Sequence, residues 1–410
     1  MANVKQAVRR IGSWVVGRLR DRSVRQAIFV FTLTRSLIFL ILILVGQFTT
    51  ETITSEHAPK YPLAVQEATI NLKDRTIGRT LRQTLAKGDI NIYTSLATHG
   101  YEKHKFDITK RASHFYAFFP LFPLLLRSLS WISNDLIILG TVLSNVLFLF
   151  ALIILHKLVI ALGYKVSVAD RALFYLAIFP TSYFFSVPMT ESLFLFLTVA
   201  SFYAAARERW WLAGIMGALC TVCRSNGILL LPALLILYWQ RHGFKIALRH
   251  GLALLLIPLG LVSYMAFCWW MTGTPLAFMA AQASWGKRFG FFLMPLIEYL
   301  MTPSQIAVPW NFLLLNFAAG VLSLIAVYLL GKQRAWALAV YLLLSILTPL
   351  STLTLLSVTR YVSVFFPVFI ALAYVGETRQ RLDQAIGFVF TLLLALMTAL
   401  FASHVTFAVA

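Results

Sequence analysis

The sequence predicts an all-α protein that crosses a membrane many times, with about ten or eleven helical segments in one bundle. Hydrophobic residues make up 60% of the 410 residues and charged residues only 12%, whereas a soluble globular domain carries roughly a quarter charged residues. The apolar residues also come in runs of about 20, the length that a helix needs to cross a bilayer. These runs are continuously apolar, which indicates helices, because the strands of a membrane barrel would alternate apolar and polar residues.

The formal net charge of +20 raises the question of nucleic-acid binding. The Lys and Arg residues stand at the ends of apolar segments, and no soluble domain carries them. This pattern is typical of residues that set membrane topology and contact anionic lipid headgroups. We therefore expect a membrane-embedded protein with no nucleic-acid partner. Cys220 and Cys223 form a C-x-x-C inside an apolar run, which favours buried core residues over a redox pair or a metal site.

The first elements are a basic segment and a first membrane span. Residues 1–26 interleave arginines with apolar residues and predict a cytoplasmic amphipathic helix on the membrane surface. Residues 27–410 are expected to form a single transmembrane domain, whose first span runs from Ala27 to Val45. Arg35 lies inside this span, where an arginine either snorkels to the interface or faces the bundle interior.

The longest hydrophilic stretch follows, over residues 47–114. With a cytoplasmic N-terminus, this loop lies on the non-cytoplasmic face. Its segment Leu63–Leu85 has helical periodicity and predicts short helices along the membrane surface. A loop of this length is more often functional than a mere connection.

The remaining spans are read from the apolar runs and from the links between them. Pro120 and Pro123 interrupt the first of these runs, which predicts a re-entrant or half-length helix. Four basic links are expected on the cytoplasmic side: Arg207–Arg209, Gln240–His250, Gly331–Arg334 and Arg379–Arg381. The expected segments are Phe115–Ile132, Leu136–Leu162, Ala172–Pro188, Ser192–Ala206, Trp211–Trp239, Ala247–Met271, Ile306–Leu330, Trp336–Leu350, Tyr361–Val375 and Ala385–Val405.

Two polar motifs at predicted helix ends contain carboxylates. Asp89 lies in Gly88–Tyr93, before His99-Gly100-Tyr101; it could act as a general base on a sugar hydroxyl, or it could cap the N-terminus of a short helix. Glu191 interrupts an apolar run, as does Arg224 in Arg224–Gly227. An arginine in a broken helix suits a phosphate through its planar donor fork, and the alternative is a structural ion pair between Glu191 and Arg224.

A third motif, Gln282–Arg288, lies in the second polar loop, and Arg360-Tyr361 begins a late helix. Tryptophan and cations at a bilayer boundary are ordinary interface anchors, but Gln282, Trp285 and the two cations Lys287 and Arg288 could also clamp a sugar ring and its phosphate. No metal-ligand spacing occurs among the histidines, so we expect no metal and no cofactor. A Gly-rich phosphate loop is also missing from the sequence, which argues against an ATPase and against direct use of a nucleotide sugar.

Taken in order, these motifs resemble those of the PIG-V-like mannosyltransferases, a family of GT-C class integral membrane glycosyltransferases. The resemblance covers most of the chain, but Gly88 stands where the family usually has tryptophan and Cys223 where it commonly has threonine. The residues that carry it are Asp89, Tyr93, Gly100 and Tyr101, the run Phe118–Pro123, Glu191–Phe194, Arg224–Gly227, then Gln282, Trp285, Gly286, Arg360 and Tyr361.

The resemblance implies a GT-C-like fold, a polyprenyl-phosphate-linked mannose or other hexose as donor, and an inverting displacement on the non-cytoplasmic face. It leaves the acceptor open among lipid, glycan and protein. Asp89 is then the expected general base, and Arg224, Arg288 and Arg360 are candidates for the phosphate. Glu191 would orient them, and the remaining substrate-binding candidates are Tyr93, Tyr101, Gln282 and Trp285.

Two other classes of function remain open at this stage. A lipid or sugar transporter or flippase would use Arg35, Glu191 and Arg224 along a substrate path, but such proteins usually show repeated halves with matching broken helices, and the sequence shows no internal repeat. A structural subunit without activity would need none of these residues to meet. The first structural question is therefore whether Asp89, Glu191 and Arg224 line one cavity that opens sideways to lipid, as an enzyme with a lipid-linked donor requires.

Overall fold

The computed structural model describes residues 21–49, 76–302 and 312–403. Every regular element in these ranges is a helix, which confirms the predicted fold class. Five helices are long and apolar enough to cross a membrane: α2 (Arg22–Thr49), α7 (Leu136–Ala161), α12 (Leu248–Thr272), α16 (Phe312–Lys332) and α20 (Gln380–Ala402). Four shorter apolar helices accompany them: α9 (Glu191–Ala206), α10 (Trp210–Cys223), α17 (Trp336–Leu350) and α19 (Pro367–Thr378).

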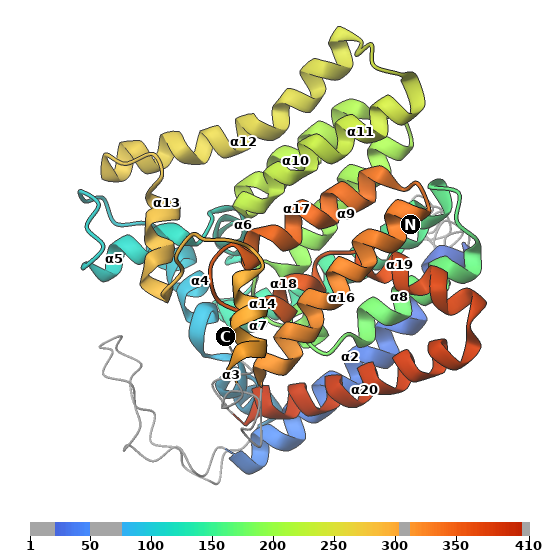
Figure 1. The fold of residues 1–410 in the computed structure, drawn as a ribbon. Helices are drawn as coiled ribbons and strands as arrows, with labels where there is room; N and C mark the ends of the chain where they lie inside the picture. Colours follow the sequence, from blue (N-terminus) through green and yellow to red (C-terminus); the bar gives the residue numbers. More distant parts are fainter. Residues whose placement is uncertain (1–20, 50–75, 303–311, 404–410) are drawn as a thin grey trace, which may run out of the picture.

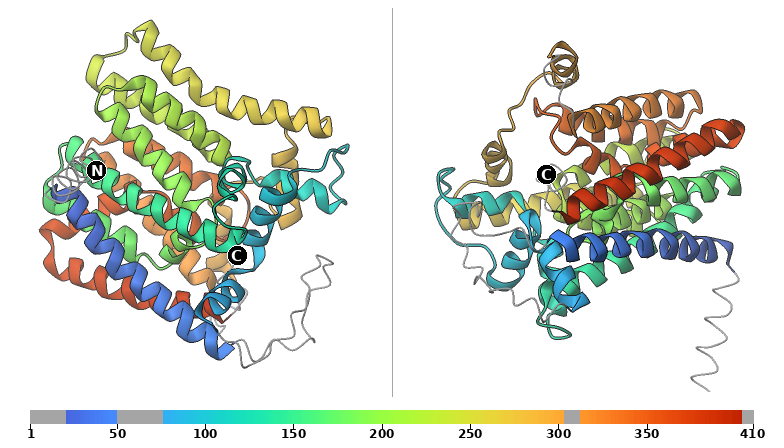
Figure 2. Two further views of the ribbon diagram at one scale, coloured as in Figure 1. Left: turned by 180° about the vertical axis from the view of Figure 1, so that it is seen from behind. Right: turned by 90° about the horizontal axis from the view of Figure 1, so that it is seen from below.

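The long helices run roughly side by side, as Figures 1 and 2 show. Helix α10 packs between α9 and α12, α7 packs against α9, and α2 lies along α20. Short helices gather at one end of the bundle, on the left in Figure 1, and we call this the site end. They are α3 (Ile77–Leu85), α4 (Gly88–His99), α5 (Arg111–His114), η3 (Phe115–Ala117), α6 (Leu121–Leu129), α13 (Ala277–Ala280), η6 (Ala281–Trp285), α14 (Met294–Met301) and α18 (Val358–Ser363).

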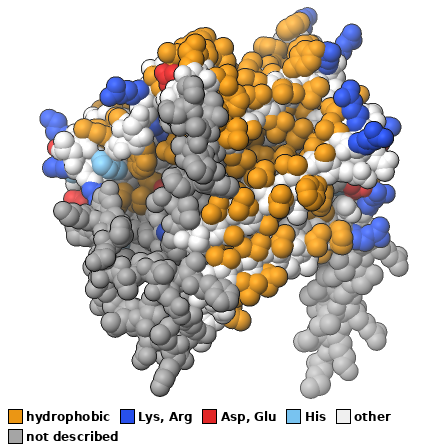
Figure 3. All heavy atoms as spheres, turned by 60° about the horizontal axis from the view of Figure 1, so that its bottom comes forward, with side chains coloured by type: hydrophobic (Ala, Val, Ile, Leu, Met, Phe, Trp, Pro, Cys, Tyr) orange, Lys and Arg blue, Asp and Glu red, His pale blue; other side chains and the backbone are white. Residues whose placement is uncertain are grey.

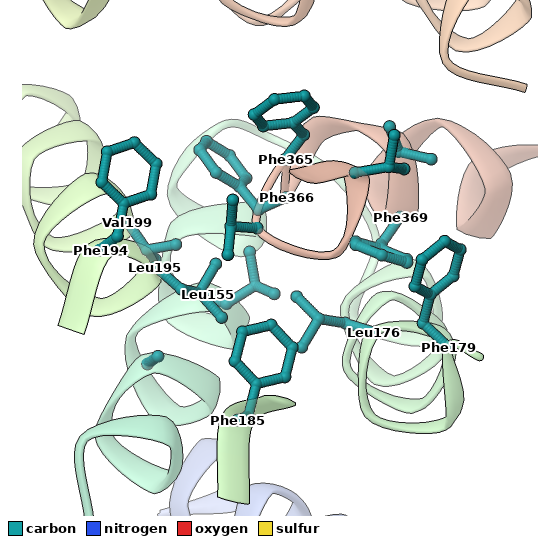
Figure 4. Close-up of a cluster of buried hydrophobic side chains, with 14 of the residues drawn as sticks. Leu155, Leu176, Phe179, Phe185, Phe194, Leu195, Val199, Phe365, Phe366 and Phe369 are labelled. Carbon is teal, nitrogen blue, oxygen red and sulfur yellow. The ribbon is translucent and has the colours of Figure 1, made fainter. Parts of the chain in front are cut away.

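Large apolar side chains fill the centre of the bundle. Figure 4 shows Phe185 beside Leu155 and Leu176, and Phe179 beside Phe369, and all five are buried. Many other large apolar side chains lie exposed on the outer surface instead, and orange side chains cover the middle of the face in Figure 3. An apolar exterior around a close-packed interior is expected of helices in lipid, so this is an integral membrane protein that crosses the bilayer several times.

The opposite end of the bundle carries the basic links, and we call it the basic end. Blue side chains gather at this edge, on the right in Figure 3. The links Arg207–Arg209, Gln240–His250, Gly331–Arg334 and Arg379–Arg381 all follow or precede helices that end there. The predicted amphipathic helix over residues 1–26 lies mostly outside the described residues, as does Leu63–Leu85 apart from its last part, which forms α3.

The predicted segment Trp211–Trp239 was wrong, because it is two helices rather than one. Helix α10 ends at Cys223, a 3-10 turn η5 (Ser225–Leu229) follows, and α11 (Leu230–His242) returns to the basic end. There Arg241 Nη1 donates to the carbonyl of Ala206 at 2.7 Å. The sequence predicted one segment because apolar residues lie on both sides of this turn and the apolar run continues across it. Gly227 makes the turn close, since a Cβ there would lie 2.5 Å from the backbone of Cys220 and Thr221.

Three further segments are broken at or near their prolines, and one of them is Tyr361–Val375, which consists of α18 (Val358–Ser363) and α19 (Pro367–Thr378). Phe115–Ile132 consists of η3 and the nine-residue α6, so a half-length helix is confirmed. Ala172–Pro188 is helical only to Ile178, where α8 (Val166–Ile178) ends, and a 3-10 turn η4 (Ser182–Ser186) leads to α9. These breaks lie inside protein, where neighbouring side chains can satisfy the freed backbone groups.

Arg35 satisfies freed backbone carbonyls at the break before η4. Its side chain is buried and faces the bundle interior, one of the two predicted alternatives. Its guanidinium donates to the carbonyls of Ala177 at 2.9 Å and Ser182 at 2.8 Å, and lies 4.7 Å from the ring centre of Phe148. Arg35 therefore ties the first span to the irregular segment that leads to Glu191, and it is separate from the polar side chains of the site end.

Candidate active site

Asp89 lies in the first turn of α4, where its negative charge suits the helix N-terminus. The N-cap residue of α4 is Lys87, so the alternative reading of Asp89 as an N-cap is wrong. The Asp89 side chain instead accepts a hydrogen bond from Arg360, with 2.9 Å between Oδ2 and Nη1. It is 29% exposed, and so it can be reached by a ligand.

Glu191 is the first residue of α9 and is fully buried. Its Oε1 accepts from Arg360 Nε at 2.7 Å and also from Arg224 Nη2. Its Oε2 has no hydrogen-bond partner among the described residues. A buried carboxylate is tolerated only when charge and hydrogen bonds compensate its desolvation, and here two guanidinium groups do so.

Arg224 lies at the turn between α10 and η5. Its Nε donates to Thr190 Oγ1 at 2.7 Å, and its guanidinium lies 5.9 Å from the ring centre of Phe194. Arg360, in α18, donates to both Glu191 and Asp89, and it lies 271 positions from Asp89 in the sequence. Asp89, Glu191, Arg224 and Arg360 thus form one charged cluster at the site end.

A lysine adjoins the charged cluster. Lys287 Nζ donates to Gln282 Oε1 at 2.9 Å and to Tyr361 Oη at 3.1 Å. Tyr361 follows Arg360 in α18, so the second polar loop reaches the cluster through this lysine. Lys287 was one of the two loop cations considered for the phosphate, but Arg288 was chosen, because nothing in the pair Lys287-Arg288 showed which of the two faces inward. Gly286, at φ +69°, turns the chain just before the pair.

Arg288, the predicted phosphate candidate, is exposed. Its backbone amide donates to the carbonyl of Thr352 at 3.3 Å. Within the described ranges, no hydrogen bond or ion pair joins its side chain to the charged cluster. Gln282 reaches the cluster only by way of Lys287, as described above.

The predicted aromatic residues have different positions. Tyr93 Oη lies 3.4 Å from Thr190 Oγ1, and its ring packs edge-on against Phe118, with ring centres 5.2 Å apart. Trp285 packs against the same Phe118, at 5.8 Å. Tyr101 donates from its hydroxyl to the carbonyl of Phe118 at 2.6 Å. Tyr93 therefore adjoins the cluster, and Tyr101 holds the Phe118–Pro123 segment in place.

Metal ligands were not predicted, and the described part of the chain contains no group of three or more His, Cys, Asp or Glu side chains that could hold a metal ion. Cys220 and Cys223 are buried, free thiols in the core. The two carboxylates of the charged cluster are bridged by Arg360. A hollow of about 470 Å³ lies at the basic end between Tyr164, Arg241 and Arg334, and it includes no residue of the charged cluster.

A family model described as mannosyltransferase (PIG-V) matches residues 24–278, more than half of the chain. The chain belongs to this family. The matched residues of this PIG-V family protein include Asp89, Glu191 and Arg224, whereas Lys287 and Arg360 lie beyond the match. The resemblance read from the sequence motifs is therefore confirmed at the level of the family.

Three relatives carry the name GPI alpha-1,6-mannosyltransferase 2. The protein of Cricetulus griseus is 32% identical over 174 residues, which is 39% of this chain and 32% of the relative. That of Mus musculus is 31% identical over 170 residues, with the same shares. That of Rattus norvegicus is 30% identical over 193 residues, which is 44% of this chain and 36% of the relative. The match thus spans about a third of each relative's own length.

Among solved structures, the Archaeoglobus fulgidus oligosaccharyltransferase tethered with an acceptor peptide is similar. It is 13% identical in sequence, with a TM-score of 0.39, and the likeness covers 76% of this chain and 50% of that one.

Proposed function

We propose that this PIG-V family protein transfers mannose from a polyprenyl-phosphate-linked donor to an acceptor hydroxyl, with inversion at the sugar C1. The observation that carries the proposal is the charged cluster, in which a partly exposed carboxylate adjoins buried cations at the ends of broken helices. The acceptor oxygen bonds to C1 as the bond between C1 and the phosphate oxygen breaks. Asp89 takes the hydroxyl proton, and the bonding electron pair leaves with the phosphate. A transition state with oxocarbenium character is expected, as in glycoside hydrolysis.

Of the two carboxylates, Asp89 fits the role of base. Glu191 is fully buried, and its Oε1 already accepts from two arginines. Asp89 is exposed to a ligand, and its Oδ2 accepts from Arg360 alone among the described residues. Glu191 then acts as a positioning residue that orients Arg224 and Arg360. Because a phosphate is already a good leaving group, no general acid is needed, and fixed cations can stabilise the charge that develops on it.

We place the site end on the non-cytoplasmic face of the membrane. The support is the positive-inside rule, since Lys and Arg residues collect at the opposite end in the basic links. The name of the relatives supports mannose as the sugar. The acceptor, whether lipid, glycan or protein, is what the assay must determine.

The proposal is tested with the purified protein in detergent. We expect it to consume polyprenyl-phosphate-mannose and form a mannosylated product with at least one member of a panel of lipid, glycan and peptide acceptors, detected by mass spectrometry. GDP-mannose should not replace the lipid-linked donor, and a polyprenyl-phosphate-glucose control tests the choice of sugar. A folded protein that consumes no donor would overturn the proposal and favour transport of a lipid-linked sugar instead.

We also propose that the reaction needs no divalent metal. Arg360 lies between Asp89 and Glu191, and Arg224 is a second partner of Glu191, so two guanidinium groups compensate two carboxylates. The transfer rate in excess EDTA is therefore expected to stay within about twofold of the untreated rate, since the cluster's charges are already paired. A lost activity that Mg²⁺ or Mn²⁺ restores would contradict this.

A further inference from the structure

The charged cluster and the adjoining Lys287 together carry one more positive charge than negative. The carboxylates are Asp89 and Glu191, and the cations are Arg224, Arg360 and Lys287, so three positive charges face two negative ones. Both arginines are held by carboxylates. Lys287 differs from them, because its partners in the described part of the chain are the neutral oxygens of Gln282 and Tyr361.

Lys287 has one N–H donor without a partner among the described residues. A lysine ammonium has three N–H donors, and two of them point to Gln282 Oε1 and Tyr361 Oη. The side chain is half-buried, and it is therefore fixed in position and still reachable. The neighbourhood of Tyr361 is electropositive. Burial raises the pKa of this phenol, but the adjacent ammonium of Lys287 and the guanidinium groups of Arg224 and Arg360 bring it below its usual value.

We propose that Lys287 binds the phosphate of the lipid-linked donor and stabilises it as the leaving group. This inference rests on the proposed function. The donor phosphodiester carries one negative charge, which matches the one surplus positive charge. After the bond to C1 breaks, the electron pair stays on the phosphate oxygen and the lipid phosphate gains a second negative charge. Lys287 keeps its protons throughout, and Gln282 and Tyr361 position its ammonium.

The conformation of the second polar loop explains why Lys287, rather than Arg288, has this role. Gly286 adopts a left-handed conformation at φ +69°, and Trp285 before it packs against Phe118. After this turn Lys287 contacts Tyr361, while Arg288 is exposed. A sugar whose phosphate binds Lys287 would therefore lie near Trp285, Tyr361 and the charged cluster.

The inference is tested by binding, without turnover. Titration calorimetry compares farnesyl phosphate with farnesol on the wild type, on Lys287→Met and on Lys105→Met, which removes an exposed lysine of the first loop. The wild type and Lys105→Met should bind the phosphate more tightly than the alcohol. Lys287→Met should weaken phosphate binding about tenfold or more, as loss of a hydrogen bond to a charged group predicts, and leave farnesol binding unchanged. Lys287→Arg should retain part of the preference.

Transfer assays separate this inference from the proposed function. If the wild type transfers mannose, Lys287→Met should raise the KM for the donor and weaken product inhibition by polyprenyl phosphate. A Lys287→Met protein with the wild-type KM and the wild-type affinity for farnesyl phosphate overturns the inference and leaves the proposed function standing. The same holds if Arg288→Met loses the affinity for farnesyl phosphate and Lys287→Met keeps it. A wild type that transfers nothing overturns the function first. Lys287→Gln serves as the second variant if Lys287→Met does not fold.

Discussion

Replacing Asp89 with asparagine is expected to lower the rate of sugar transfer about 100-fold or more, as the loss of a general base predicts. The amide has nearly the same shape as the carboxylate, and its oxygen can still accept from Arg360 Nη1, which lies 2.9 Å from Asp89 Oδ2. It cannot take a proton from the acceptor hydroxyl. The loss should therefore appear in kcat, with the KM for the donor little changed. Steady-state rates at saturating donor give both constants.

The control for this variant is Glu102→Gln, which removes another exposed carboxylate of the first loop. It should transfer sugar at the wild-type rate. Asp89→Glu keeps the carboxylate but moves it, and we expect an intermediate rate. If Asp89→Asn has the wild-type kcat, the base lies elsewhere, and Glu191→Gln is the next variant to measure.

The sequence predicted most of the bundle because membrane helices are determined by local composition. Runs of apolar residues located α2, α7, α12 and α20, and the prolines at 120 and 123 located a half-length helix. The hairpin of α10 and α11 was missed for the same reason. A tight turn inside protein can be as apolar as the helices around it, and only Arg224–Gly227 marks it in the sequence.

The candidate site was predicted less completely, since it depends on contacts between distant segments. Asp89, Glu191, Arg224 and Arg360 were named from polar residues at helix ends and from their order along the chain, and the structure brings all four together. The bridge that Arg360 makes between two carboxylates has no local signal. Neither has the choice between Lys287 and Arg288, because one turn at Gly286 decides which side chain faces Tyr361.

The second large effect is expected from Arg360→Met. This change leaves Glu191, which is fully buried, with Arg224 as its only cation among the described residues, and it leaves Asp89 unpaired. Breaking a buried ion pair by removing one partner typically costs about 3 kcal/mol or more. We expect the free energy of unfolding to fall by that amount and transfer to be lost. Reversible unfolding in mixed detergent micelles measures the first effect, and the transfer assay measures the second.

Two further variants separate charge from geometry. Arg360→Lys keeps the charge but not the planar fork that reaches both carboxylates, so it should fold and transfer sugar slowly. In the double variant Arg360→Met, Glu191→Gln, the buried charge is removed together with its partner. Its free energy of unfolding should fall by about 1–3 kcal/mol less than the sum of the losses in the two single variants. If the losses in free energy of unfolding are strictly additive, Arg224 alone compensates the buried charge of Glu191. Arg360 would then stabilise the protein through Asp89, independently of Glu191.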